Sequence, residues 1–131
     1  WEELPCFPVN CSSSNVVACE TNRSLYMFSG YDNGVLPFIQ KFNLGSCVWV
    51  ILSVRLPYAF HGVPCFILDS KRIGFLTSAG VHCLSIETES SLTLEARQID
   101  YGYTCCSGIY RNEVLYLSSP YGRAKSFTLN L

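Results

Sequence analysis

The sequence predicts an all-β protein in which a four-stranded antiparallel sheet is repeated about three times. Its apolar residues fall in short runs bounded by Gly, Pro, Asn, Asp or Ser, and the long 3.6-residue patterns of helices are absent. The chain also repeats itself with a period of about 40–50 residues, the length of one four-stranded blade of a β-propeller. Together these observations predict a propeller segment.

Two tryptophans mark the repeat. Trp49 stands 48 residues after Trp1, and an aromatic residue follows each of them at a similar distance. Tyr26 lies 25 residues after Trp1, and Phe75 lies 26 residues after Trp49. Tyr116 belongs to a third copy that lacks the Trp. We expect Tyr26, Phe75 and Tyr116 to occupy equivalent, buried places in their blades.

The apolar runs predict where strands lie. They are Leu25–Phe28, Val48–Leu52, Cys65–Leu68 and Val114–Leu117. These runs do not alternate with polar residues, which is typical of a sheet that is covered on both faces. Blades stacked around an axis cover one another in this way. A two-sheet sandwich would leave one face of each sheet exposed and is the second choice.

The repeat also predicts the organisation of the chain as a single propeller segment. A lone blade strand is expected over 1–8, whole blades over 9–57 and 58–99, and a partial blade over 100–131. The strand over 1–8 is in phase to pair with the three strands of the last blade. Because closed propellers have about 4–8 blades, either further blades lie elsewhere in the parent chain or the segment is an open arc with exposed edges.

The stretch 25–34 resembles the kelch repeat, a β-propeller family whose blades carry an aromatic strand ending near two glycines. In that family a Tyr-Asp-like pair, a Trp and a Pro-containing link follow. Trp49, Pro57 and His61 match the later part of the pattern, whereas Ser29 replaces one of the glycines. The second and third copies keep less of it. The resemblance covers nearly all of the chain and implies about three blades of the galactose oxidase/kelch-like superfamily.

The resemblance implies an adaptor that binds a protein partner through two kinds of loop. These loops join the second to the third strand of a blade, or the fourth strand to the next blade. Exposed Tyr and Arg dominate contact hot spots. The residues expected to bind the partner are Tyr31, Asp32, Asn33, Tyr58, His61, Tyr101, Tyr103, Tyr121 and Arg123. The alternative is that these residues only cap the ends of the blades.

No enzyme activity and no cofactor are expected. His61 and His82 are the only imidazoles, and neither lies in a motif that joins a nucleophile to a base. The eight cysteines lack the spacing of zinc sites. Cys65 and Cys106 take equivalent places in two blades, which favours a packing role. No phosphate loop or dinucleotide fingerprint occurs.

The charges exclude some partners. Nine Lys and Arg residues balance ten Asp and Glu residues, so no basic cluster favours nucleic acid. No uncharged run is long enough to cross a membrane as a helix. The resemblance implies a protein partner, and we expect the protein to lie in the cytoplasm. The alternative is a secreted or surface propeller with oxidase or glycan-binding activity, which four disulfides would support and eight free thiols would oppose.

Overall fold

The computed structural model describes residues 3–6, 8–9, 15–28, 37–57, 64–77, 79–90, 92–97, 107–118 and 124–129. The described residues form eleven strands in three antiparallel sheets and no helix, so the predicted all-β propeller segment is confirmed. Within this part of the chain, no helix is long and apolar enough to cross a membrane.

Each sheet is a meander in which strands that follow one another in the chain pair with one another. The first sheet contains β1 (Asn15–Cys19), β2 (Ser24–Phe28), β3 (Phe38–Asn43) and β4 (Val48–Arg55). The second contains β5 (Cys65–Asp69), β6 (Arg72–Thr77), β7 (Gly80–Ser85) and β8 (Leu92–Arg97). The third contains β9 (Ser107–Arg111), β10 (Val114–Ser118) and β11 (Lys125–Thr128). All four runs predicted as strands lie inside these elements.

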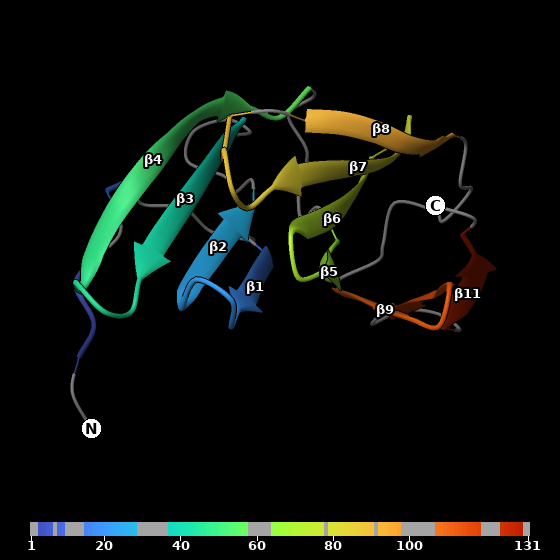
Figure 1. Cartoon of the computed structure of the whole chain (residues 1–131), viewed down its shortest axis with the longest axis horizontal. Coiled ribbons are helices and arrows are strands. Elements are labelled where there is room, and N and C mark those ends of the chain that lie inside the picture. The colour runs from blue at the N-terminus through green and yellow to red at the C-terminus, as the bar shows by residue number, and fades with distance from the viewer. Residues whose placement is uncertain are drawn as a thin grey trace.

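The three sheets stand side by side in an open arc (Figure 1). The first strands of the sheets lie on its inner side, where β1 contacts β5 and β5 contacts β9. The last strands, β4, β8 and β11, lie at the free edges of their sheets. Each sheet therefore turns a face toward its neighbour, as stacked blades do.

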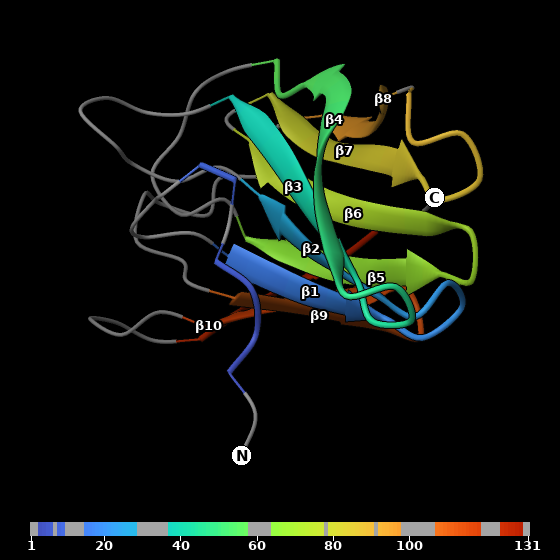
Figure 2. The same ribbon diagram turned by 90° about the vertical axis from the view of Figure 1, so that its left-hand side faces the viewer.

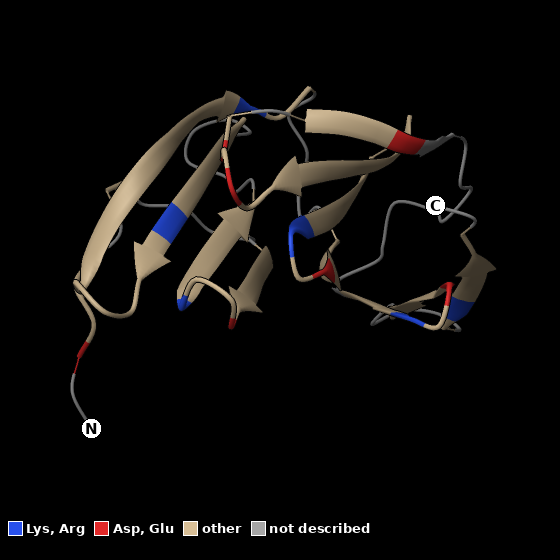
Figure 3. Cartoon of the chain, in the orientation of Figure 1, with Lys and Arg blue, Asp and Glu red and all other residues tan. Residues whose placement is uncertain are grey.

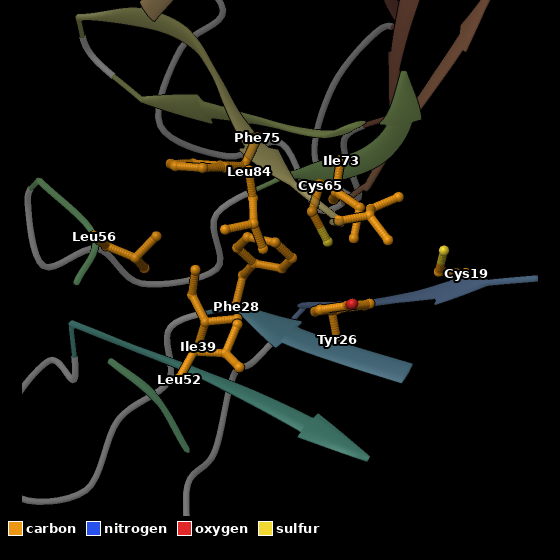
Figure 4. Packing of buried hydrophobic residues seen from close by; sticks show 11 residues of the cluster. Cys19, Tyr26, Phe28, Ile39, Leu52, Leu56, Cys65, Ile73, Phe75 and Leu84 are labelled. Atoms are coloured by element: carbon orange, nitrogen blue, oxygen red, sulfur yellow. The ribbon is translucent and has the colours of Figure 1, made fainter. Parts of the chain in front are cut away.

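One apolar cluster joins the first sheet to the second (Figure 4). The rings of Phe28 and Phe75 lie at its centre, with their centroids 5.3 Å apart. Tyr26, Ile39, Ile73 and Leu84 surround them and are fully buried. A second cluster joins the second sheet to the third, where Phe66, Leu68, Leu76, Val81 and Cys83 pack against Leu115, Leu117 and Leu129.

The middle sheet explains why the apolar runs do not alternate. In β5, Cys65 and Ile67 face the first sheet, whereas Phe66 and Leu68 face the third. Successive side chains point to opposite faces of a strand, and here both faces are covered. The prediction that sheets are covered on both sides is confirmed for this sheet.

The predicted equivalence of Tyr26, Phe75 and Tyr116 is wrong for Phe75, which lies on the opposite face of its sheet from the other two. Tyr26 faces the following sheet, but Phe75 faces back toward the preceding one. A shift of one residue reverses the side of a strand on which a residue lies, and the two spacings from Trp differ by one residue. Tyr116 points away from the second sheet and is 52% exposed, so the expectation that it is buried is also wrong.

The N-terminal stretch differs from the strand expected over 1–8. Residues 3–6 form no strand. They lie beside the first sheet, where the indole N–H of Trp49 donates a hydrogen bond of 2.8 Å to the carbonyl oxygen of Pro5. Trp1 is outside the described residues.

The tight turns contain residues that have positive φ although they are not glycine. Arg23, Cys47, Glu89, Asn112 and Glu113 all have φ between 51° and 63°. Each lies in a hairpin turn that links the first strand of a sheet to the second or the third to the fourth. The turns of the first two sheets gather on the right in Figure 2. We call this side of the sheets the turn end and the opposite side the loop end.

Candidate partner-binding surfaces

The predicted loops all belong to the loop end. They join β2 to β3, β4 to β5, β6 to β7, β8 to β9 and β10 to β11, which are the connections opposite the tight turns. The predicted partner-binding residues themselves, Tyr31, Asp32, Asn33, Tyr58, His61, Tyr101, Tyr103, Tyr121 and Arg123, lie outside the described residues. What the structure describes is the set of strand ends that flank them.

One of these connections is described in part. The amide of Ala79 donates a hydrogen bond of 3.1 Å to Oγ1 of Thr77, whose hydroxyl donates in turn to the carbonyl of Gly80. Thr77 is buried. Gly80 has a φ of 131°, a backbone angle that residues with a Cβ rarely adopt. The β6–β7 connection is thus tied closely to the sheet at both strand ends.

A groove of about 570 Å³ lies at the turn end of the second sheet. Residues of the β5–β6 turn, of β7 and of β8 line it, on the face of the second sheet that is turned toward the third sheet. Its lining residues are Asp69, Ser70, Lys71, Arg72, Cys83, Ser85, Glu87, Thr93 and Glu95. Figure 3 shows many of the charged residues of the described chain in turns and near strand ends. Five of the groove residues, Asp69, Lys71, Arg72, Glu87 and Glu95, are charged.

Arg72 joins the two sides of the groove. Its Nε lies 2.7 Å from Oδ2 of Asp69, and its Nη1 lies 3.6 Å from Oε1 of Glu95. Partial burial alone would raise the pKa of Asp69, but hydrogen bonds from the Lys71 amide and the Arg72 guanidinium outweigh it and lower that pKa. Within the groove, the Arg72 cation therefore lies between the carboxylates of Asp69 and Glu95.

Two buried thiols of the second sheet are poor nucleophiles: Cys83 lines the groove, and Cys65 lies on the opposite face of the sheet. Burial raises the pKa of Cys83 to about 12, with a smaller contribution from the charge of Glu95. Burial likewise raises the pKa of Cys65 to about 12. Because the thiolate is the reactive form, both side chains act as small apolar groups in the cores, as predicted for Cys65. Cys106 is outside the described residues.

A second polar cluster joins the first two sheets. The hydroxyl of Tyr26 donates to Oε1 of Glu89, which also accepts a hydrogen bond of 2.5 Å from Lys41. Asn22 donates to the same hydroxyl at 2.6 Å. Burial, with the hydrogen bond to Glu89, raises the pKa of Tyr26. The phenol is held in its protonated form, so the cluster links the sheets and does not generate a phenolate.

His82 packs against the first core. Its imidazole stacks on Phe75 at a centroid distance of 5.4 Å and is 8% exposed. Burial lowers the pKa of His82, and its Nε2 has no hydrogen-bond partner. In the part of the chain that the structure describes, no group of three or more His, Cys, Asp or Glu residues could hold a metal ion.

Sequence reasoning missed the groove and the Tyr26 cluster. One local signal existed for the groove, because Asp in a turn often accepts hydrogen bonds from amides two residues later. Asp69 does so from Lys71 at 2.8 Å. No local pattern could pair Tyr26 with Glu89, since they meet only when two sheets stack.

Comparisons with known proteins place the fold. No family model and no curated protein matches the sequence. Among solved structures, that of YjhT superposes with a TM-score of 0.75 over 98% of this chain, at 11% sequence identity. The match covers 55% of the YjhT chain, so this chain spans about half of its length. At this identity the likeness shows the fold alone, a propeller-like segment of antiparallel sheets.

Proposed function

We propose that this chain is a kelch-type interaction module that binds a protein partner through the loop end of its sheets. One observation carries the proposal: the five predicted loops start and finish at the same end of three sheets whose faces pack on one another. Binding residues are commonly placed on loops that a rigid scaffold positions. The nine predicted residues belong to these loops; five of them are Tyr and one is Arg, residue types that dominate contact hot spots.

We also propose that the module is an adaptor of the cytoplasm. All five described cysteines, Cys6, Cys19, Cys47, Cys65 and Cys83, are free thiols. Disulfides are rare in the cytoplasm and common in secreted domains. Free thiols in the described residues therefore support an intracellular location over the secreted alternative.

The test compares three loop variants with one groove variant. Tyr31→Ala, Tyr121→Ala and Arg123→Ala remove predicted contacts, and Arg72→Gln serves as the control at the turn end. Each protein is used as bait in quantitative affinity enrichment from cytosol, with circular dichroism to verify folding. We expect a set of proteins to be retained by the wild type and Arg72→Gln and to be depleted with the loop variants.

Other outcomes would contradict the proposal. Equal retention of the same proteins by all variants would show that the loops do not bind them. Depletion only with Arg72→Gln would move binding to the groove. A reproducible signal on a glycan array, with no protein retained selectively, would favour the glycan-binding alternative.

A further inference from the structure

Gln40 places a buried amide in an apolar row of the first sheet. Its neighbour Ile39 faces the second sheet, so Gln40 points to the opposite side of β3. There it lies between Met27 and Ile51 in a cross-strand row that begins at Val16. Gln40 is only 2% exposed. Burying an amide costs free energy unless its oxygen and its N–H groups find partners, so this position requires a polar group beside it.

The main chain of Val9 supplies such a group. Its backbone N–H donates to Oε1 of Gln40, and its carbonyl accepts from Nε2 of Gln40, each at 3.2 Å. Two residues that face each other in an antiparallel sheet exchange the same pair of hydrogen bonds. The side chain of Gln40 therefore binds the backbone of Val9 as a neighbouring strand would. These two bonds do not depend on which side chain the bound residue carries.

Trp49 binds the same stretch four residues earlier. Its indole N–H donates a hydrogen bond of 2.8 Å to the carbonyl oxygen of Pro5, which is again a main-chain atom. The indole packs on the ring of Phe42, with the centroids 5.0 Å apart, and Phe42 is fully buried. Packing within the sheet therefore holds both Gln40 and Trp49 in place. We call these two side chains the clamp.

The stretch in the clamp is bound through its main chain and buries little of its own. Residues 3–6 and Pro8 are exposed and belong to no strand. In sequence, Pro5-Cys6-Phe7-Pro8 has the Pro-x-x-Pro pattern. Proline favours an extended backbone, and segments of this pattern bind aromatic-lined sites in that form. A segment held in this way can be exchanged for another with the same backbone shape.

We propose that the clamp is a binding site for an extended peptide segment with the Pro-x-x-Pro pattern. The stretch around Pro5 and Val9 occupies it in the structure, and a segment of the same chemistry from a protein partner can take its place. The main chain of that segment then accepts from the indole of Trp49 and exchanges two hydrogen bonds with Gln40. The clamp lies on β3 and β4 and uses no loop-end residue. It can therefore fail while the loop-end proposal holds, and the reverse.

The first test adds the segment as a separate peptide. A fluorescent, amidated peptide with the sequence of residues 3–10, carrying Cys6→Ser, is titrated into the full chain and followed by polarisation. The chain's own stretch competes at a high effective concentration. Val9→Pro in the chain removes the N–H that donates to Gln40, and should raise the affinity for the peptide about two- to tenfold. Val9→Ala keeps that N–H and is the matched control, with the affinity of the wild type.

Variants of the clamp should weaken this binding. In the Val9→Pro background, Gln40→Met replaces the amide by an apolar side chain of similar size and should lower the affinity by about tenfold or more. Trp49→Phe keeps a ring against Phe42 but loses the indole N–H, and should also lower it. Circular dichroism and thermal melting verify that each variant is folded. Equal affinity of Gln40→Met and its parent, or no binding of the peptide to the Val9→Pro chain, contradicts the proposal.

The second test changes the peptide and leaves the Val9→Pro chain as it is. A peptide with N-methylvaline at position 9 lacks the N–H that donates to Gln40 but keeps the valine side chain, so it should bind more weakly than the parent peptide. Alanine in place of both prolines should also weaken binding, because the unbound peptide then samples more conformations. An N-methylated peptide that binds as tightly would show that Gln40 does not bind the main chain. Unchanged binding without the prolines would overturn the proposed pattern.

Discussion

Gly74 brings the backbone of β6 close to a side chain of the second core. It lies opposite Phe66 in the β5–β6 pair, and the Phe66 ring covers it. A Cβ at Gly74 would lie 2.3 Å from Cε2 of Phe66, well inside contact distance. Phe66 is 1% exposed and packs against the third sheet, so its ring has little room to move.

We expect Gly74→Ala to destabilise the protein by about 1–3 kcal/mol, the usual cost of overpacking a core. Urea unfolding followed by circular dichroism measures the change. Phe66→Leu in the same background should recover part of the loss, because the smaller side chain makes room for the methyl group. A Gly74→Ala protein as stable as the wild type would show that the ring moves freely.

His82 should make stability depend on pH. Burial holds its pKa in the folded protein below the ordinary value, so the unfolded chain binds the proton more readily. Stability is therefore full above about pH 6.5, the pKa of an unfolded histidine, and falls as the pH drops below it. Urea midpoints across this range measure the fall. His82→Phe should flatten the profile, and an unchanged slope would assign the effect to another group.

The hairpin between β9 and β10 turns on two residues. Asn112 and Glu113 have φ values of 51° and 63°, the pair of positive angles found in type I′ turns. Asn adopts this conformation readily, but Glu does so at a cost. The backbone angle that the turn requires is therefore unfavourable for Glu113.

We expect Glu113→Gly to stabilise the protein by up to about 1 kcal/mol, because glycine adopts positive φ without steric cost. Thermal and urea unfolding measure the gain. Glu113→Ala is the control and should gain nothing, since alanine has the same Cβ. An equal gain from both would point to the lost charge and not to the backbone.

The elements that could be predicted are those that local sequence determines. Runs such as Leu25–Phe28 are apolar, rich in β-formers and bounded by turn residues, so their strands follow from composition. The sequence could not predict which face of its sheet Phe75 lies on. The repeat spacing shifts by one residue there, and successive side chains of a strand point to opposite faces. The place of Pro5 and Val9 beside the first sheet depends on Trp49 and Gln40, which only the folded sheet aligns.

The candidate site was predicted only in outline. The repeat assigned the interaction residues to connections at one end of the blades, since a meander alternates its ends. The groove around Arg72 gathers side chains from a turn and two strands. Their convergence depends on strand twist and on the bulge near Val81, neither of which the sequence pattern reveals.

The contact between the first and second sheets has a polar component. Glu89 accepts from Tyr26 and from Lys41, and the Lys41 and Glu89 side chains are 16% and 22% exposed. Losing the carboxylate leaves a buried hydroxyl and a mostly buried ammonium group without their acceptor. Such groups are costly to leave unpaired.

We expect Glu89→Ala to lower stability by about 1–3 kcal/mol, less than for a fully buried ion pair because water still reaches the cluster. In a Lys41→Met background, the same change should cost less. The double-mutant cycle gives the coupling between the two charges. Additive losses would show that Tyr26, and not Lys41, depends on the carboxylate.

The thiols report on the packing of the whole molecule. Cys19, Cys65 and Cys83 are buried between sheets, whereas Cys6 and Cys47 are exposed. Brief alkylation of the native protein, read out by peptide mass spectrometry, should modify the exposed pair quickly and the buried three only after denaturant is added. Rapid labelling of Cys65 or Cys83 would mean that neighbouring sheets separate readily.

Among the described residues, the second sheet divides the apolar interior into two compartments that share no side chain. A void opened near Phe28 should leave the rotamers around Leu117 undisturbed, because a hydrogen-bonded sheet stands between them. The energetic effects of substitutions in the two compartments should then simply sum. During evolution, either compartment can change its residues without a compensating change in the other, so a family of such chains would diverge as two independent layers.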